Sequence, residues 1–123
     1  MNQKDKWLLA LRPEISTSPA LNLAEEFQNS VLRPILKFQH ERISALFQAH
    51  IQKRKVNLSG ISLEARKDYV EAAFHKDLAL RHQLIGLALA LMTEKEWLAF
   101  SSDKELARRL NNLLVQRIQS TLP

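Results

Sequence analysis

The sequence predicts an all-α fold, a compact bundle of four or five helices with one long helix kinked at a proline. Apolar residues recur at helical spacing through most of the chain, and no segment alternates with β-branched residues as strands do. The 123 residues include 2 glycines and 4 prolines, too few for a turn-dense β architecture. Since 46% of the residues are apolar and 25% are charged, the composition is that of a folded protein. We expect a polar lead-in over residues 1–17 and a single helical domain over residues 18–123.

The first long helix is expected to begin at Ser18-Pro19, because a hydroxyl caps free N–H groups and proline suits the first helical position. It is expected to end among the cations at residues 53–55, which suit the negative end of the helix dipole. Pro34 removes a backbone donor within this run and predicts a kink or a short break. A straight helix over residues 20–54 would be ~50 Å long, far beyond the ~14 Å radius of gyration of a compact domain. Unless Pro34 folds the helix back, one end projects, so we expect a homodimer.

A second long helix is expected after a loop at residues 57–61, with Ser62 as its cap. Its apolar stripe extends over residues 63–91. Asp77 interrupts this stripe and has two interpretations: it belongs to a buried ion pair, or it caps a new helix that starts directly after it.

Two capping-box patterns, at residues 93–96 and 102–105, predict a short helix over 94–100 and a final helix over 103–121. The final helix is expected to bury Leu106, Leu110, Leu113, Leu114 and Ile118. Large apolar side chains of the short helix region are also expected in the core: Met92, Trp97 and Phe100.

Positive charge is concentrated between residues 31 and 60. The chain has 18 Lys+Arg and 13 Asp+Glu, a net charge of +5, and in this segment Glu41 is the only acidic residue. Helical spacing places Arg33, Lys37 and Lys55 on one polar stripe opposite the apolar face. Nucleic-acid binders usually carry more cations, often with exposed aromatic side chains. We therefore interpret this basic face as solvated and rank nucleic-acid binding last among the functions considered.

Polar side chains that interrupt the apolar helix faces are the candidate site residues. They are Gln39, Arg42, His50, Asp77, Arg81 and Arg117. Asp77 and Arg81 are four residues apart, a spacing at which a carboxylate and a guanidinium meet on one helix face. Because a buried ion must be paired, we expect these two to form an ion pair, with Gln39, Arg42 or Arg117 as further partners. The cluster is then either a satisfied structural network or a pocket in which an arginine holds an anionic ligand.

Several classes of protein are excluded or disfavoured. Cysteine is absent, which excludes disulfides, Cys-ligated zinc and thiol catalysis. The four histidines do not form an HExxH pattern and no GxSxG occurs, so we predict no metal, no cofactor and no catalytic residue. The longest apolar run, residues 84–92, is shorter than the ~20 residues that span a bilayer, and we find no secretory signal. We expect a cytoplasmic protein without membrane contact.

Three segments carry a resemblance to other proteins: FQNSVLRPILKFQHERISALF at residues 27–47, KDLALRHQLIGLALA at residues 76–90, and Arg109 together with Gln116-Arg117. They resemble a group of small, all-helical, uncharacterised bacterial proteins, some of which carry a glyoxalase-type label. The resemblance covers about 90 residues, from 27 to 119. It implies an all-helical architecture with no established function, and it identifies no catalytic residue.

These features lead to three functional hypotheses. The first is a non-enzymatic protein–protein interaction module that self-associates, or binds another protein, through an apolar helix face, with Arg33 and Lys37 setting the orientation. The alternative is a small-ligand-binding or catalytic bundle whose interior pocket is lined by the Asp, Arg and Gln residues of the polar cluster. The second alternative is weak nucleic-acid binding through the basic face of residues 31–60.

Overall fold

The computed structural model describes residues 1–122, and within that range helices are joined by turns and short irregular segments, and no strand is present. In chain order the elements are α1 (Gln3–Ala10), α2 (Leu23–Phe27), the π-helical turn η1 (Gln28–Leu32), α3 (Arg33–Phe38), α4 (His40–Arg54), the 3₁₀ turn η2 (Leu58–Gly60), α5 (Leu63–Lys76), α6 (Leu78–Leu89), α7 (Glu94–Ser101) and α8 (Lys104–Ser120). The predicted all-α class is confirmed. The predicted number of helices is not, because breaks at Gln39 and Asp77 divide the two long helices.

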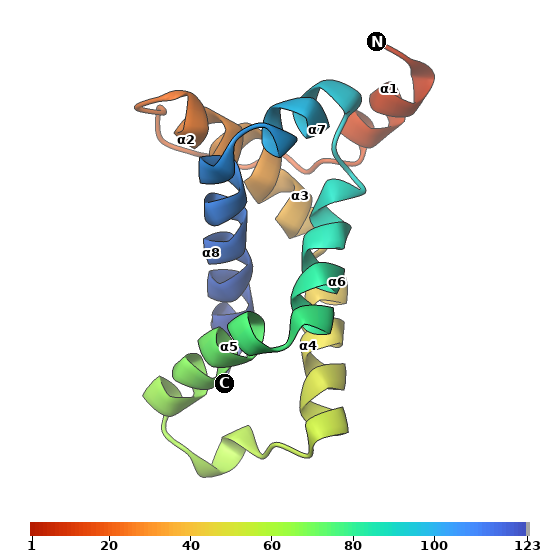
Figure 1. Cartoon of the computed structure of the whole chain (residues 1–123). Helices are drawn as coiled ribbons and strands as arrows, with labels where there is room; N and C mark the ends of the chain where they lie inside the picture. The colour runs from red at the N-terminus through yellow and green to blue at the C-terminus, as the bar shows by residue number, and fades with distance from the viewer. Residues whose placement is uncertain (123) are drawn as a thin grey trace.

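The helices pack around one core. α4 lies beside α6, and α8 contacts both of them as well as α5 (Figure 1). α5 lies at the end of the molecule where α8 ends, whereas α1, α2 and α7 lie at the other end (Figure 1). The core contains these fully buried side chains: Leu32, Ile35, Leu36, Ile43, Phe47, Val70, Phe74, Leu84, Leu110, Leu114 and Ile118. Over residues 1–122, none of the helices combines the length and apolar character that crossing a membrane requires.

The Ser18-Pro19 start predicted for the first long helix is wrong. α2 instead begins at Leu23, with Asn22 as its cap, because the Asn22 side-chain oxygen accepts a hydrogen bond from the Glu25 N–H at 2.8 Å. Asparagine satisfies a free N–H about as well as serine does. Residue preference alone therefore did not distinguish the two starts.

Residues 1–17 contain α1, and Arg12 fastens this segment to α7. The Arg12 guanidinium donates hydrogen bonds to both carboxylate oxygens of Glu96, one of them at 2.6 Å, and to the Leu91 carbonyl at 3.1 Å. Burial raises the pKa of Glu96, but hydrogen bonds from Arg12 and Thr93 outweigh burial and the pKa is lowered overall. This contact ties the first segment of the chain to the core.

The single kink predicted at Pro34 is not confirmed, because two irregularities flank this residue. Before it, in η1, the Arg33 N–H donates to the carbonyl of Gln28, five residues back. Such a wider turn suits the approach to a proline, whose ring collides with the carbonyl four residues back in a regular α-helix. After it, Gln39 leaves helical geometry (φ −91°, ψ 5°) and separates α3 from α4. The predicted long helix is therefore divided on both sides of the proline.

Asp77 ends α5 and caps α6, so the helix predicted over residues 63–91 is divided in two. Its backbone is extended (φ −91°, ψ 94°), and its Oδ1 accepts a hydrogen bond from the Leu80 N–H at 3.1 Å. Of the two interpretations of Asp77, the structure therefore shows the cap of a new helix. The preceding helix begins as predicted, because the Ser62 hydroxyl oxygen accepts from the Ala65 N–H at 3.1 Å.

One predicted capping box is confirmed and the other is wrong. Thr93 and Glu96 exchange hydrogen bonds between side chain and backbone at the start of α7. At the start of α8, Asp103 rather than Ser102 is the cap, accepting from the Glu105 N–H at 2.9 Å. The two helices nevertheless lie within a residue or two of their predicted bounds, because either cap satisfies the same free N–H groups.

The predicted core of the final helix is confirmed. All five of its expected residues are buried: Leu106, Leu110, Leu113, Leu114 and Ile118. Met92 is buried as well, and Phe100 packs at the edge of the core, with its ring centroid 6.5 Å from that of Phe27. Trp97 was expected in the core but is 46% exposed. A short helix of 8 residues can turn only one narrow face inward, so not every large apolar side chain in it is buried.

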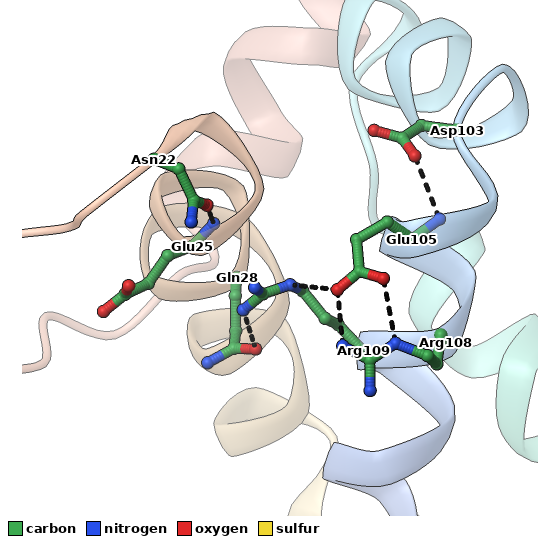
Figure 2. Close-up of polar contacts among 7 residues, drawn as sticks. All are labelled: Asn22, Glu25, Gln28, Asp103, Glu105, Arg108 and Arg109. Atoms are coloured by element: carbon green, nitrogen blue, oxygen red, sulfur yellow. Dashed lines mark hydrogen bonds and ion pairs between the residues drawn. The ribbon is translucent and has the colours of Figure 1, made fainter.

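Polar contacts join the start of α8 to η1 (Figure 2). Arg109 donates to the Gln28 side-chain oxygen and to the Glu105 carboxylate, each at 3.0 Å. Arg108 donates to the same carboxylate at 2.9 Å, and this hydrogen-bonded contact lowers the pKa of Glu105 to about 2. The positive charge of Arg109 is therefore compensated by a carboxylate within its own helix.

Candidate functional site

A cavity of about 720 Å³ opens between α4 and α5, near the junction of α5 with α6. Its polar lining consists of His50, Lys53, Arg54, Tyr69, Lys76 and Asp77, and its apolar lining of Val56, Ala72 and Ala73. A second cavity of about 360 Å³ between α4 and α6 shares four of these residues: His50, Lys53, Arg54 and Asp77. His50 and Asp77 therefore line both cavities, and we refer to the first as the His50 cavity.

His50 is 8% exposed and has a hydrogen-bond partner for each ring nitrogen. Nδ1 lies 2.9 Å from the Asp77 Oδ2, and Nε2 lies 2.9 Å from the Tyr69 hydroxyl oxygen. Because an ionised carboxylate can only accept, Nδ1 carries the proton, and in the neutral ring Nε2 accepts from the Tyr69 hydroxyl. The ring also stacks on Phe47, with centroids 5.8 Å apart. The carboxylate, imidazole and phenol thus form one hydrogen-bonded network, Asp77–His50–Tyr69.

Two helices, α4 and α5, and the junction between α5 and α6 position this network. His50 follows Phe47 by nearly one turn of α4, so both side chains point to the same buried face. Tyr69 lies on α5, and its ring packs edge-on against Phe47 at a centroid distance of 6.5 Å. Asp77 lies at the α5–α6 junction, where the extended backbone of the cap lets one carboxylate oxygen bind Leu80 and the other bind His50.

The surroundings of the hydrogen-bonded network fix the ionisation of Asp77 and Tyr69. The Leu80 N–H lowers the pKa of Asp77 most, burial opposes it, and His50 and Arg54 lower it further, so the net shift is downward. Burial raises the pKa of Tyr69, although Arg54 partly opposes this effect. At neutral pH Asp77 is therefore a carboxylate and Tyr69 a neutral phenol.

The His50 cavity carries a surplus of positive charge. Lys53, Arg54 and Lys76 line it, whereas Asp77 is its one acidic lining residue. Arg54 lies 3.4 Å from the Asp77 carboxylate, but Lys53 and Lys76 form no ion pair with any residue in 1–122. Because Asp77 is already shared with His50, the two lysines are left to attract an anion from solvent.

Only two of the predicted site residues, His50 and Asp77, meet in this cavity. The predicted Asp77–Arg81 ion pair is wrong: across the described residues, Asp77 pairs with His50 and Arg54. The Arg81 guanidinium instead donates to the His75 carbonyl at 3.5 Å. The four-residue spacing assumes one continuous helix, whereas Asp77 has an extended backbone and lies outside α6, where it caps the Leu80 N–H.

The other predicted residues lie elsewhere. Gln39 donates to the Leu87 carbonyl at 3.1 Å, and Arg42 is exposed on α4. Arg117, on α8, donates to the Nδ1 of His40 at 3.1 Å. The structure therefore does not bring these three side chains into the His50 cavity.

The predicted basic face is divided between two settings. Lys37 and Lys55 are exposed, as expected for a solvated face. Lys55 also ends α4 by adopting the left-handed conformation (φ 56°). Arg33 is half-buried and lines a separate cavity together with Arg117.

Sequence reasoning missed Tyr69, Lys53, Arg54 and Lys76. Tyr69 is the one tyrosine in the chain and lies two turns before Asp77, which is a signal that could have suggested a shared face. No such local signal links α5 to His50. Within residues 1–122, no three His, Asp or Glu side chains are grouped so as to hold a metal ion.

Comparisons with protein-family models, curated proteins and solved structures give no match to this chain. The similarity to small helical bacterial proteins therefore stays a prediction.

Proposed function

We propose that this protein binds a small organic anion in the His50 cavity. The observation that carries the proposal is a buried histidine held at both nitrogens, in a cavity lined by three cations and one carboxylate. A volume of about 720 Å³ lies within the range of ligand pockets in proteins, roughly 300–1,000 Å³. This is the small-ligand alternative considered for the polar cluster, with a different set of lining residues.

The chemistry of the lining specifies the kind of anion. The cations Lys53 and Lys76 lie at the edge of the cavity, whereas Ala72, Ala73 and Val56 give it an apolar wall. A ligand that satisfies both has an acidic group and a hydrocarbon or aromatic body, such as a carboxylic acid or a phosphate monoester.

The hydrogen-bonded network Asp77–His50–Tyr69 is better suited to ligand binding than to catalysis. Nucleophilic or general-base catalysis by Tyr69 would require a phenolate, and burial raises the pKa of Tyr69 instead of lowering it. In its neutral form the hydroxyl donates its one proton to His50 and so has none left to donate to an anion. His50 and Asp77 therefore fix the Tyr69 ring in the cavity wall. The acidic group of the ligand is bound by Lys53 and Lys76.

The test is a titration of the ¹⁵N-labelled full chain with hexanoate and with phenyl phosphate, followed by amide chemical shifts. We expect saturable shifts at residues lining the His50 cavity, and none with the neutral analogue hexanamide. Lys76→Gln should weaken binding by about threefold or more, as loss of an exposed charge contact does. The matched control is Lys67→Gln, an exposed lysine on the same helix outside the cavity.

Three results would reject this function: no saturable shift in the cavity with either anion, equal binding of hexanoate and hexanamide, or equal weakening by Lys67→Gln and Lys76→Gln.

Self-association is a second candidate, favoured by exposed apolar side chains on the helices that gather at one end of the molecule (Figure 1). Trp7 on α1 is 65% exposed, Leu23 on α2 is 87% exposed, and Leu98 on α7 is 55% exposed. Burial of such side chains against a second copy is the usual source of association energy. Sedimentation at micromolar concentration tests it: we expect a dimer that Trp7→Gln with Leu98→Gln dissociates, and a monomeric wild type would remove this candidate.

A further inference from the structure

We propose a second anion site, selective for a phosphate group, in the cavity that Arg33 and Arg117 share between α3 and α8. This cavity has a volume of about 210 Å³, less than a third of that of the His50 cavity. It is lined by Arg33, Leu36, Leu113, Gln116, Arg117 and Ser120, none of which lines the His50 cavity. The two sites are therefore separate, and this one does not depend on the proposed function.

Both arginines of this cavity carry a positive charge that no carboxylate of the described residues compensates. Within residues 1–122, neither Arg33 nor Arg117 forms an ion pair. The Arg117 guanidinium donates to a ring nitrogen, His40 Nδ1, at 3.1 Å, and the Arg33 Nε lies 3.4 Å from the Asn29 side-chain oxygen. On the same helix as Arg117, Arg109 shows the opposite situation, since Glu105 neutralises it (Figure 2).

The two guanidiniums also act on each other. Burial lowers the pKa of Arg117, and the positive charge of Arg33 lowers it further. Both side chains nonetheless stay protonated at neutral pH, because an arginine does not lose its proton in a protein. Two like charges in one small, half-buried cavity repel each other, and an anion between them would replace this repulsion with attraction on both sides.

The donor geometry specifies the class of ligand. Each guanidinium presents a planar fork of N–H donors that matches the oxygen spacing of phosphate, and Gln116 adds amide donors at the same cavity. A tetrahedral dianion can accept from two forks at once, whereas a chloride ion cannot. The small volume suits the phosphate group itself, either as inorganic phosphate or as the end of a phosphate monoester whose body extends into solvent.

The experiment measures binding of inorganic phosphate to the full chain by calorimetry, at fixed ionic strength with chloride as the balancing anion. We expect saturable binding that Arg33→Gln and Arg117→Gln each weaken by about tenfold or more, because each removes a charged hydrogen-bonding fork. If Arg117→Gln does not fold, Arg33→Gln carries the test alone. The matched control is Arg42→Gln, an exposed arginine on α4 that lines neither cavity.

Glycerol 3-phosphate is titrated in parallel to distinguish the two sources of the group. Tighter binding of the ester identifies an organic phosphate as the ligand, and equal or weaker binding identifies free phosphate. Unchanged phosphate affinity in Arg33→Gln, or equal weakening in Arg42→Gln, overturns the proposal. Lys76→Gln should leave phosphate binding unaltered, and loss of phosphate binding in that variant would assign the phosphate to the His50 cavity instead.

Discussion

Replacement of Asp77 tests whether one side chain both caps α6 and holds His50. In Asp77→Ala, the Leu80 N–H and the His50 Nδ1–H lose their acceptors together. In Asp77→Ser, the hydroxyl still caps the helix but is too short to replace the carboxylate at His50. Comparison of the two variants therefore separates the two roles of the carboxylate.

The expected magnitudes follow from the two contacts. Loss of an N-cap costs about 1 kcal/mol, and a buried donor left without a partner costs about 1–3 kcal/mol. The imidazole is nearly fully buried, at 8% exposure, so water does not restore the lost acceptor easily. We expect Asp77→Ala to lower the free energy of unfolding by about 2–4 kcal/mol, and Asp77→Ser by about 1 kcal/mol less than that.

Urea unfolding followed by circular dichroism at 222 nm measures both values, with an unchanged m-value showing that the change is in stability. Long-range ¹H–¹⁵N spectra of the imidazole give a second readout: the proton should reside on Nδ1 in the wild type and lose this preference in Asp77→Ser. A cost below about 0.5 kcal/mol in Asp77→Ala, or equal stability of the alanine and serine variants, would refute the double role of Asp77.

The difference in unfolding free energy between wild type and Asp77→Ser should change with pH in one direction. The pKa of Asp77 is lowered in the folded protein, chiefly by the Leu80 N–H, so folding favours the ionised carboxylate. The stabilisation is complete above the ordinary aspartate pKa, near 4, and is lost as the pH falls through the lower folded-state value. The part of the stability difference between wild type and Asp77→Ser that comes from this carboxylate should therefore shrink as the pH falls below about 4.

Two further predictions concern stability away from the sites. Glu96→Gln should destabilise the protein by about 2 kcal/mol in urea unfolding, somewhat less than for a fully buried pair, because the Arg12 and Glu96 side chains are 10% and 17% exposed. The exposed neighbour Glu94→Gln serves as its control and should change stability by less than about 0.5 kcal/mol. Gly86→Ala should stabilise the protein by about 0.5–1 kcal/mol, because glycine is unfavourable inside α6 and an added methyl meets no atom within 4 Å. A lower urea midpoint in Gly86→Ala would contradict that reasoning.

Part of the candidate site could be predicted from the sequence. His50 and Asp77 were identified because both are polar residues on apolar helix faces, and the structure places them in contact. Their partner Tyr69 was missed because a tyrosine on a helix face looks like an ordinary core residue. The pairing of Asp77 with Arg81 was wrong because the four-residue rule assumes a continuous helix, and the chain breaks at Asp77.

The sequence by itself determined the features that depend on neighbours within about four residues. The leucine stripe of α8, the Thr93–Glu96 capping box and the end of α4 among its cations are all set by local hydrogen bonds and helical periodicity. Tertiary structure decided which residues of different helices lie close together. His50 is 19 residues from Tyr69 and 27 from Asp77, and Arg33 on α3 lines one cavity with Arg117 on α8. Such contacts depend on how helices pack, and packing is set by the sum of many buried side chains rather than by any short pattern.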